Sequence, residues 1–202
     1  EKIRQELGAP KIIVLLRNPI DKAYSQYMHL VRDQRETLSF YEALLAEEER
    51  KEQKWSDIWR YAESSLYADR LEGYIDCFGR DNVHIIVFDE FVQQTQSVMM
   101  ALFRFLGVDD NVSVNTEEQY NRTGTARSKA VANFLNKPSA VKSFVKRVTP
   151  DAWRISLRLK MMNLNTAGKD EVDSCAQDYL REYFANDLSK LEKLIGRSLG
   201  WI

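Results

Sequence analysis

Long apolar runs and a large excess of one charge are missing from this sequence, and cysteine is scarce. No apolar run approaches the roughly 20 residues that cross a bilayer, and the start, Glu1 to Arg4, lacks a charged-then-apolar leader pattern. We therefore expect a soluble globular protein with no transmembrane segment. Two cysteines, Cys77 and Cys175, are too few for a disulfide framework and favour a reduced, cytoplasmic setting. A processed secreted fragment would have the same composition.

Metal-ligand clusters and a glycine-rich phosphate loop are missing as well. The two histidines, His29 and His84, do not stand at ligand spacing with a cysteine or an acidic cluster, so we expect no metal cofactor. The eight glycines are scattered, and no G-x-x-x-x-G-K pattern is present. We interpret His84 as a core or edge residue of a strand and His29 as a surface or interhelical residue.

Charge is balanced over the whole chain but unevenly placed along it. The formal net charge of −1 argues against a general nucleic-acid binder. Residues 122–160 contain ten Lys or Arg and one acid, a net charge of +9, whereas residues 33–72 contain eleven acids and six bases, a net charge of −5. A basic segment attracts anionic ligands or polymers, although a solvated helical face has the same composition.

The 202 residues, 44% hydrophobic and 29% charged, suffice for one domain with a substantial core. Residues 12–16 are continuously apolar, which predicts a strand buried on both faces. A helix signal follows at once and runs to about Arg32. Asn18 is a favoured N-cap residue, Pro19 suits the first helical position, and the carboxylate of Asp21 suits the first turn.

The rest of the chain alternates helices with one more strand. Helical patterns cover residues 40–54, 66–78, 174–195 and a segment that ends at Gly107, and residues 83–88 form a second buried strand. This order predicts an α/β fold, a parallel sheet flanked by helices with a mostly helical C-terminal part. Ligand sites of such sheets lie beyond the carboxyl ends of the strands, where Arg17 and Asp89 fall.

Three consecutive glutamates, Glu47, Glu48 and Glu49, resemble a catalytic cluster at first sight. Consecutive residues of a helix point in different directions, so we interpret them as a solvated surface.

Arg17 stands at the end of a buried strand and just before a helix. There its guanidinium can point to the same place as the free amides of the helix's first turn, a geometry that suits a phosphate. Asn18 and Ser25 are seven residues apart and share one helix face, so the Ser25 hydroxyl can add to the anion site. A capped helix with a surface arginine is the alternative interpretation.

Residues 17–27, RNPIDKAYSQY, closely resemble the 3′-phosphate-binding segment of sulfotransferases that use 3′-phosphoadenosine 5′-phosphosulfate (PAPS). Further stretches resemble the same family in the expected order, and the pattern is closest to the bacterial and heparan-sulfate-type branches. These stretches are LYADRLEGYIDCFGRDNVHIIVFDEF at 66–91, FRFLGV at 103–108 and LSKLEKLIGRSLGW at 188–201. The resemblance implies a P-loop-NTPase-like sulfotransferase fold.

The resemblance also implies roles for five residues. Arg17 and Ser25 would hold the 3′-phosphate of the donor. Tyr67 matches a tyrosine that often lies near the nucleotide, and it fits the apolar stripe of its own helix equally well. In the loop NRTGTARSK, Gly124 would let the backbone approach an anion and Arg127 would reach the 3′-phosphate from the opposite side. An ordinary basic loop is the alternative for that segment.

Members of this family begin with a strand, a Gly- and Lys-containing loop and a helix that cradle the 5′-phosphosulfate. Only ten residues precede Lys11, so we expect residues 1–202 to be a single sulfotransferase domain that is N-terminally incomplete. A glutamate acts as the base in heparan-type enzymes, and we expect it to lie outside this chain, so the catalytic residues stay unknown.

The reaction implied is transfer of a sulfuryl group from PAPS to a hydroxyl or amine of an acceptor glycan or small molecule, without a metal. The setting would be the Golgi lumen for a eukaryotic heparan-type enzyme. Trp153, Arg154 and Arg158 belong to an acceptor groove or to the packing of a basic helix.

Two other functions are compatible with the residues. Another nucleotide-binding α/β protein, such as a phosphotransferase, would need a phosphate loop and magnesium-binding acids upstream. A non-enzymatic module that binds acidic polymers through residues 122–160 would lose affinity steeply with salt and would not need Arg17.

Overall fold

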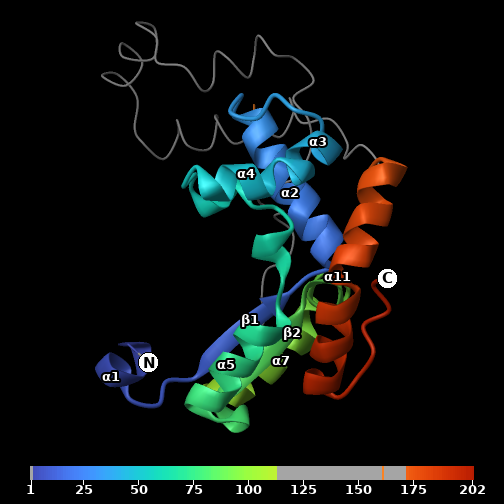
Figure 1. The fold of residues 1–202 in the computed structure, drawn as a ribbon. Helices are drawn as coiled ribbons and strands as arrows, with labels where there is room; N and C mark the ends of the chain where they lie inside the picture. The colour runs from blue at the N-terminus through green and yellow to red at the C-terminus, as the bar shows by residue number, and fades with distance from the viewer. Residues whose placement is uncertain (1, 113–160, 162–171) are drawn as a thin grey trace, which may run out of the picture.

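The structure, a computed structural model, describes residues 2–112, 161 and 172–202. A short parallel sheet lies at the centre of this part of the chain, with helices around it (Figure 1). The strands are β1 (Ile12–Leu16) and β2 (Val83–Val87), and the α-helices are α1 (Lys2–Leu7), α2 (Pro19–Arg32), α3 (Phe40–Leu45), α4 (Glu47–Glu52), α5 (Ala68–Phe78), α6 (Phe88–Gln93), α7 (Thr95–Leu106) and α11 (Ser174–Ile195). Three 3₁₀ turns, Asp57–Trp59, Glu63–Ser65 and Arg80–Asn82, connect them.

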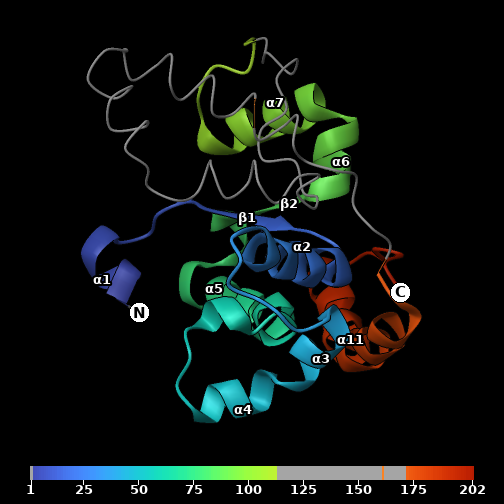
Figure 2. The same ribbon diagram turned by 90° about the horizontal axis from the view of Figure 1, so that it is seen from above.

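The predicted parallel α/β arrangement is confirmed. Strand β1 pairs with β2 in parallel, from Ile12 opposite Val83 to Leu16 opposite Val87. Helices α5 and α11 lie on one side of the sheet, and α6 and α7 lie on the other (Figure 2). Helix α2 starts directly beyond the carboxyl end of β1, which places the residues between Leu16 and α2 at the edge where ligand sites of parallel sheets lie.

The prediction that β1 is buried on both faces is wrong for the described residues. Leu16 is fully buried, but Ile13 is 47% exposed and Leu15 is 52% exposed, so burial alternates along the strand. An unbroken apolar run shows that both faces tolerate burial; it does not show that both are covered.

The single helix predicted over residues 40–54 is two helices, α3 and α4, which meet at Ala46. Helix α3 begins with a capping box, because Ser39 and Glu42 each bond the other's backbone amide. The glutamate-rich composition of residues 40–54 predicts a solvated surface element, which is wrong in part, since Phe40 and Leu44 are buried in the core. A glutamate-rich composition concealed one apolar face of α3.

The three consecutive glutamates at the start of α4 also differ in their exposure to solvent. Glu48 and Glu49 are exposed, as predicted, but Glu47 is half-buried and accepts hydrogen bonds from the backbone amides of Ala62 (2.7 Å) and Glu63 (3.3 Å). Burial raises the pKa of Glu47 above its usual range. Glu47 is therefore a structural cap of the 3₁₀ turn that follows residue 62.

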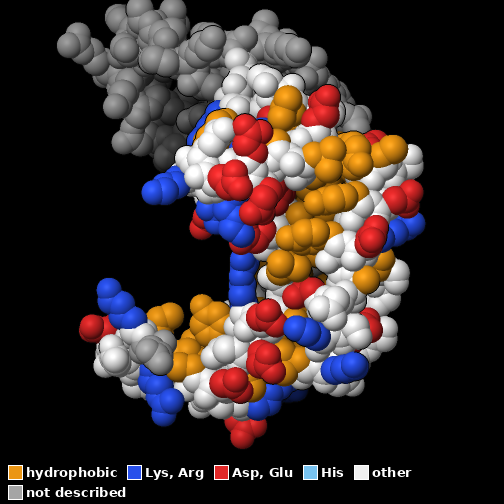
Figure 3. All heavy atoms as spheres, viewed as in Figure 1, with side chains coloured by type: hydrophobic (Ala, Val, Ile, Leu, Met, Phe, Trp, Pro, Cys, Tyr) orange, Lys and Arg blue, Asp and Glu red, His pale blue; other side chains and the backbone are white. Residues whose placement is uncertain are grey.

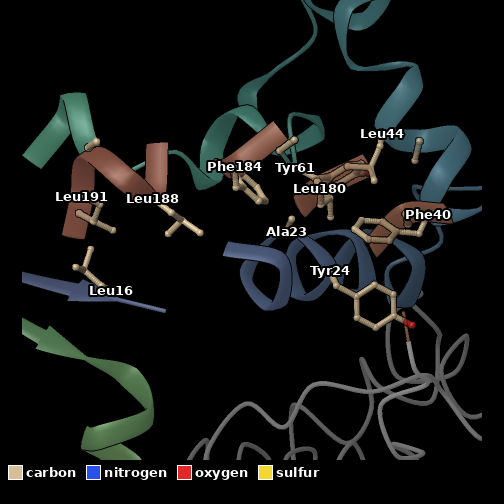
Figure 4. Close-up of a cluster of buried hydrophobic side chains, with 14 of the residues drawn as sticks. Leu16, Ala23, Tyr24, Phe40, Leu44, Tyr61, Leu180, Phe184, Leu188 and Leu191 are labelled. Atoms are coloured by element: carbon tan, nitrogen blue, oxygen red, sulfur yellow. The ribbon is translucent and has the colours of Figure 1, made fainter. Parts of the chain in front are cut away.

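Helix α11 supplies the central wall of the core. Its buried side chains face β1, α2 and α3 in turn, with Leu191 near Leu16 at one end and Leu180 near Ala23 at the other (Figure 4). The amphipathic pattern of residues 174–195 predicts an apolar stripe that includes Tyr183; most of this stripe packs in the core, but Tyr183 is 39% exposed. The stripe's fully or largely buried members are Ala176, Leu180, Phe184, Leu188 and Leu191.

A buried ion pair ties α4 to the segment after α2. The Arg50 guanidinium forms a two-pronged pair with the Glu36 carboxylate, at 2.8 and 3.1 Å, and Tyr61 donates its hydroxyl to the same carboxylate at 2.6 Å. Burial acts to raise the pKa of Glu36, but the bonds from Arg50 and Tyr61 outweigh it and hold that pKa below its usual range. This pair fixes α4 against the rest of the helical part.

The molecular surface is hollowed between the end that carries α1 and the end that carries α4, and Lys and Arg side chains lie at the back of this hollow (Figure 3). Within the described ranges, no helix is both long enough and apolar enough to cross a bilayer.

Candidate functional site

Arg17 is the first residue beyond the end of the β1–β2 ladder, and its guanidinium lies 5.0 Å from the centre of the Phe88 ring. Phe88 is the equivalent residue after β2, so the two strand ends together place the cation on an aromatic face. Arg17 is half-buried. No carboxylate among the residues that the structure describes forms an ion pair with it. A half-buried cation at this edge suits an anionic ligand.

The backbone of Arg17 is held by Tyr67. The Tyr67 hydroxyl donates to the Arg17 carbonyl at 3.0 Å and lies 3.4 Å from the Arg17 amide, so it replaces the strand partner that the ladder no longer supplies. Burial raises the pKa of Tyr67 to about 12, which keeps the hydroxyl protonated and able to donate. Tyr67 thus lies beside the predicted phosphate residue.

Asn18 caps α2, as the sequence predicts, but in doing so it occupies amides that we expected to be free. Its Oδ1 accepts from Ile20 at 3.0 Å and Asp21 at 3.4 Å, Lys22 donates to the Asn18 carbonyl, and Pro19 has no amide hydrogen. The first turn of α2 therefore has no spare donor in this conformation. These amides are therefore not free for an anion beside Arg17, which corrects the helix-amide geometry expected from the sequence.

Ser25 lies on α2, two turns beyond the cap, and is 9% exposed. The helical repeat places Ser25 on the same face of α2 as Asn18, the residue that follows Arg17. Its hydroxyl therefore lies on the helix face for which the sequence predicts phosphate binding.

Lys22, on α2 between Arg17 and Ser25, was missed by the sequence analysis. Its ammonium group donates to the Ser64 carbonyl and, at 3.2 Å, to the Ser65 hydroxyl, and it lies 5.7 Å from the centre of the Tyr67 ring. Burial, with a smaller effect of Arg70, lowers the pKa of Lys22 to about 8. Lys22 holds the segment before Tyr67 against α2, a contact for which a lysine in a helix gives no sequence signal.

The residues after α11 form a second support that the sequence did not reveal. Asn18 Nδ2 donates to the carbonyl of Trp201 at 3.2 Å, and the rings of Trp201 and Tyr67 lie 6.5 Å apart. The Arg197 guanidinium forms a bidentate ion pair with the carboxylate of Glu90 in α6, and one of its two hydrogen bonds is 3.0 Å long. The C-terminal residues are thereby attached to both strand ends.

The other candidates lie away from this site or outside the described residues. Gly124 and Arg127 lie outside the described residues, as do Trp153, Arg154 and Arg158. The His84 ring stacks on Phe105 at 4.9 Å, and His29 is half-buried on α2; burial lowers the pKa of both.

Asp89, which lies in the first turn of α6 and not in β2, is exposed. The described ranges contain no cluster of three or more His, Cys, Asp or Glu side chains that could hold a metal ion.

The fold and the site define an α/β protein with a half-buried arginine at the carboxyl ends of its parallel strands. The sulfotransferase domain model matches residues 5–173, and the chain belongs to that family. A crystal structure of a sulfotransferase from Alicyclobacillus acidocaldarius is similar, with a TM-score of 0.71 and 31% sequence identity over 99% of this chain and 60% of that one. Comparison with curated proteins returns no match.

Proposed function

We propose that this protein is a PAPS-dependent sulfotransferase and that Arg17 binds the 3′-phosphate of the donor. The observation that carries the proposal is the position of the Arg17 guanidinium, half-buried over the Phe88 ring with no carboxylate partner among the described residues. A half-buried cation without a counter-charge has lost part of its solvation, and a bound phosphate compensates for this loss.

Four further residues complete the proposed donor site. The Ser25 hydroxyl donates to the same phosphate from two turns along α2, and Tyr67 fixes the backbone of Arg17. Gly124 and Arg127 are proposed to approach the phosphate from a second side, on the family resemblance alone. A guanidinium presents paired donors to phosphate oxygens, so Arg17 supplies both charge and orientation.

The donor supplies an activated sulfuryl group. In the proposed reaction a bond forms between sulfur and an acceptor oxygen or nitrogen, the bond from sulfur to the bridging oxygen of the phosphosulfate breaks, and adenosine 3′,5′-bisphosphate leaves. The acceptor loses one proton to a base, and its class is a glycan or a small molecule that carries a hydroxyl or an amine. The described residues serve this reaction by holding the 3′ end of the donor in place. Fixing the donor in this way raises the reaction rate, because the sulfuryl group is then correctly oriented toward the acceptor.

The test is calorimetric titration of this chain with adenosine 3′,5′-bisphosphate and, separately, with adenosine 5′-monophosphate. We expect the wild type to prefer the bisphosphate, and Arg17→Ala to weaken bisphosphate binding by about 10- to 100-fold with little effect on the monophosphate, since charged hydrogen bonds carry this much. Ser25→Ala should weaken it by about fivefold, as for one neutral hydrogen bond.

Arg32→Ala is the matched control, because Arg32 lies on the last turn of the same helix and pairs with its neighbour Asp33. This variant should bind both nucleotides as the wild type does. Equal wild-type affinity for the two nucleotides, no bisphosphate binding by the folded chain, or an Arg17→Ala variant that keeps the preference would overturn the proposal.

A further inference from the structure

We infer that Asp187 of α11 is a positioning residue for the phosphate-binding arginine, acting on Arg17 through Tyr67. The inference rests on the proposed function, because it concerns the same donor site. Asp187 lies outside residues 5–173, which match the sulfotransferase domain model, and 170 residues from Arg17 along the chain.

The first link is the start of α5. The backbone amides of Tyr67 and Ala68 donate to the two carboxylate oxygens of Asp187 at 2.9 and 3.0 Å. Tyr67 stands at the N-cap position of α5, and its own side chain forms no capping bond. Asp187 therefore does from another helix what an N-cap side chain does locally, and its negative charge also suits the positive end of α5.

The second link is the side chain of Tyr67, which is directed away from α5 to the end of β1. Its hydroxyl donates to the Arg17 carbonyl at 3.0 Å and lies 3.4 Å from the Arg17 amide. Two bonds thus fix the backbone at Tyr67 and Ala68, and the hydroxyl of Tyr67 fixes the Arg17 backbone. The position of the guanidinium depends on that backbone, since Arg17 lies one residue beyond the last paired residue of β1.

The packing of α11 does not require Asp187. Buried leucines and Phe184 already hold α11 in the core, and Asp187 itself is half-buried. Loss of its carboxylate would leave this apolar contact intact while freeing the two amides at the start of α5. The effect expected is a small shift of Tyr67 and, with it, a loss of orientation at Arg17.

Asp187→Asn tests this inference, since an amide keeps the shape of the side chain but can accept only one of the two bonds. We expect bisphosphate affinity to fall about fivefold, as for one hydrogen bond, and monophosphate affinity to stay unchanged. Asp178→Asn is the matched control: it makes the same change on an exposed residue of the same helix and should alter neither affinity.

Tyr67→Phe provides the second variant, because it keeps the ring in the core and removes only the hydroxyl. It should reproduce the selective loss of bisphosphate affinity. The double variant with Asp187→Asn should lose no more affinity than the weaker-binding single variant, because both residues act through the same chain of contacts. Additive losses would mean independent effects and would overturn the inference.

A merely structural cap would show a different result. Asp187→Asn would then lower the melting temperature but keep the ratio of the two nucleotide affinities at a temperature where the chain is folded, and the inference would be wrong while Arg17→Ala still abolished the preference. If the wild type shows no preference, or Arg17→Ala keeps it, the proposed function fails and the inference fails with it.

Discussion

The side-chain amide of Asn18 donates to the backbone carbonyl of Trp201 at 3.2 Å and so joins residues 183 positions apart. This bond identifies which end of the amide group is nitrogen. The oxygen is left to accept from Ile20 and Asp21 at the start of α2. The C-terminal residues therefore set the orientation of a helix cap beside Arg17.

This relationship predicts that Asn18→Asp is destabilising even though aspartate is an equally good N-cap residue. The carboxylate keeps the capping oxygen but places a second oxygen against the Trp201 carbonyl, where a donor is needed. We expect the free energy of unfolding in urea to fall by about 1–3 kcal/mol. Asp173→Asn, the reverse change at the cap of α11, should stay within about 0.5 kcal/mol of wild type. Equal stability of Asn18→Asp and wild type would contradict the prediction.

The buried pair of Glu36 and Arg50 predicts a large cost when one partner is removed. Their side chains are 2% and 8% exposed, and Arg50→Met leaves a buried carboxylate without its cation. The expected loss in unfolding free energy is about 3 kcal/mol. Lys51→Met is the control, because it breaks an exposed pair with Glu63 and should cost less than about 1 kcal/mol.

A double variant, Glu36→Gln with Arg50→Met, removes both charges and should recover part of that stability. The free energy of unfolding should also depend differently on pH in the acid range. Because the pKa of Glu36 is lowered on folding, its contribution is present above the ordinary glutamate pKa near 4.5 and is lost as the pH falls through the lower folded value. Denaturant titrations of all variants at pH 7 and below pH 4.5 would show both effects, and a double variant less stable than Arg50→Met would contradict them.

Lys22 predicts an effect of the same sign in the alkaline range, because its pKa is also lowered on folding. Its pKa is about 8 in the folded protein and 10.5 as the ordinary value, so between these limits the unfolded chain binds more protons and stability rises with pH. We expect wild type to gain stability relative to Lys22→Met as the pH is raised from 7.5 to 10, measured by urea unfolding. Lys190 is exposed, so the free energy of unfolding of Lys190→Met should change with pH in parallel with that of wild type. Parallel curves for Lys22→Met would show that the ammonium group is not buried.

The packing of α11 predicts a sharp contrast between adjacent residues. Phe184 is fully buried, whereas Tyr183 is 39% exposed. Phe184→Ala should cost about 3–5 kcal/mol in unfolding free energy, the range for emptying a core aromatic position. Tyr183→Ala should cost about 1 kcal/mol. Similar costs for the two variants would mean that α11 presents a different face to the core.

Local patterns predicted the elements around the site well. The apolar run before Arg17, the cap and proline that follow it, and the stripe of α11 each identified an element that the structure contains. The break of helix 40–54 at Ala46 was not predicted, because no glycine or proline marks it. It follows from Glu47, which turns to the amides of a distant 3₁₀ turn, and from Arg50, which reaches Glu36.

The sequence by itself determined that Arg17 would stand between a strand and a capped helix, since hydrophobic continuity and the Asn18–Pro19 signal act over a few residues. Only the tertiary structure decided what surrounds that arginine. Phe88, Tyr67 and Trp201 reach the site from distant parts of the chain, and the cap uses the amides that local reasoning left free. Such contacts depend on how helices pack against the sheet, and packing joins side chains whose separation along the sequence carries no local signal.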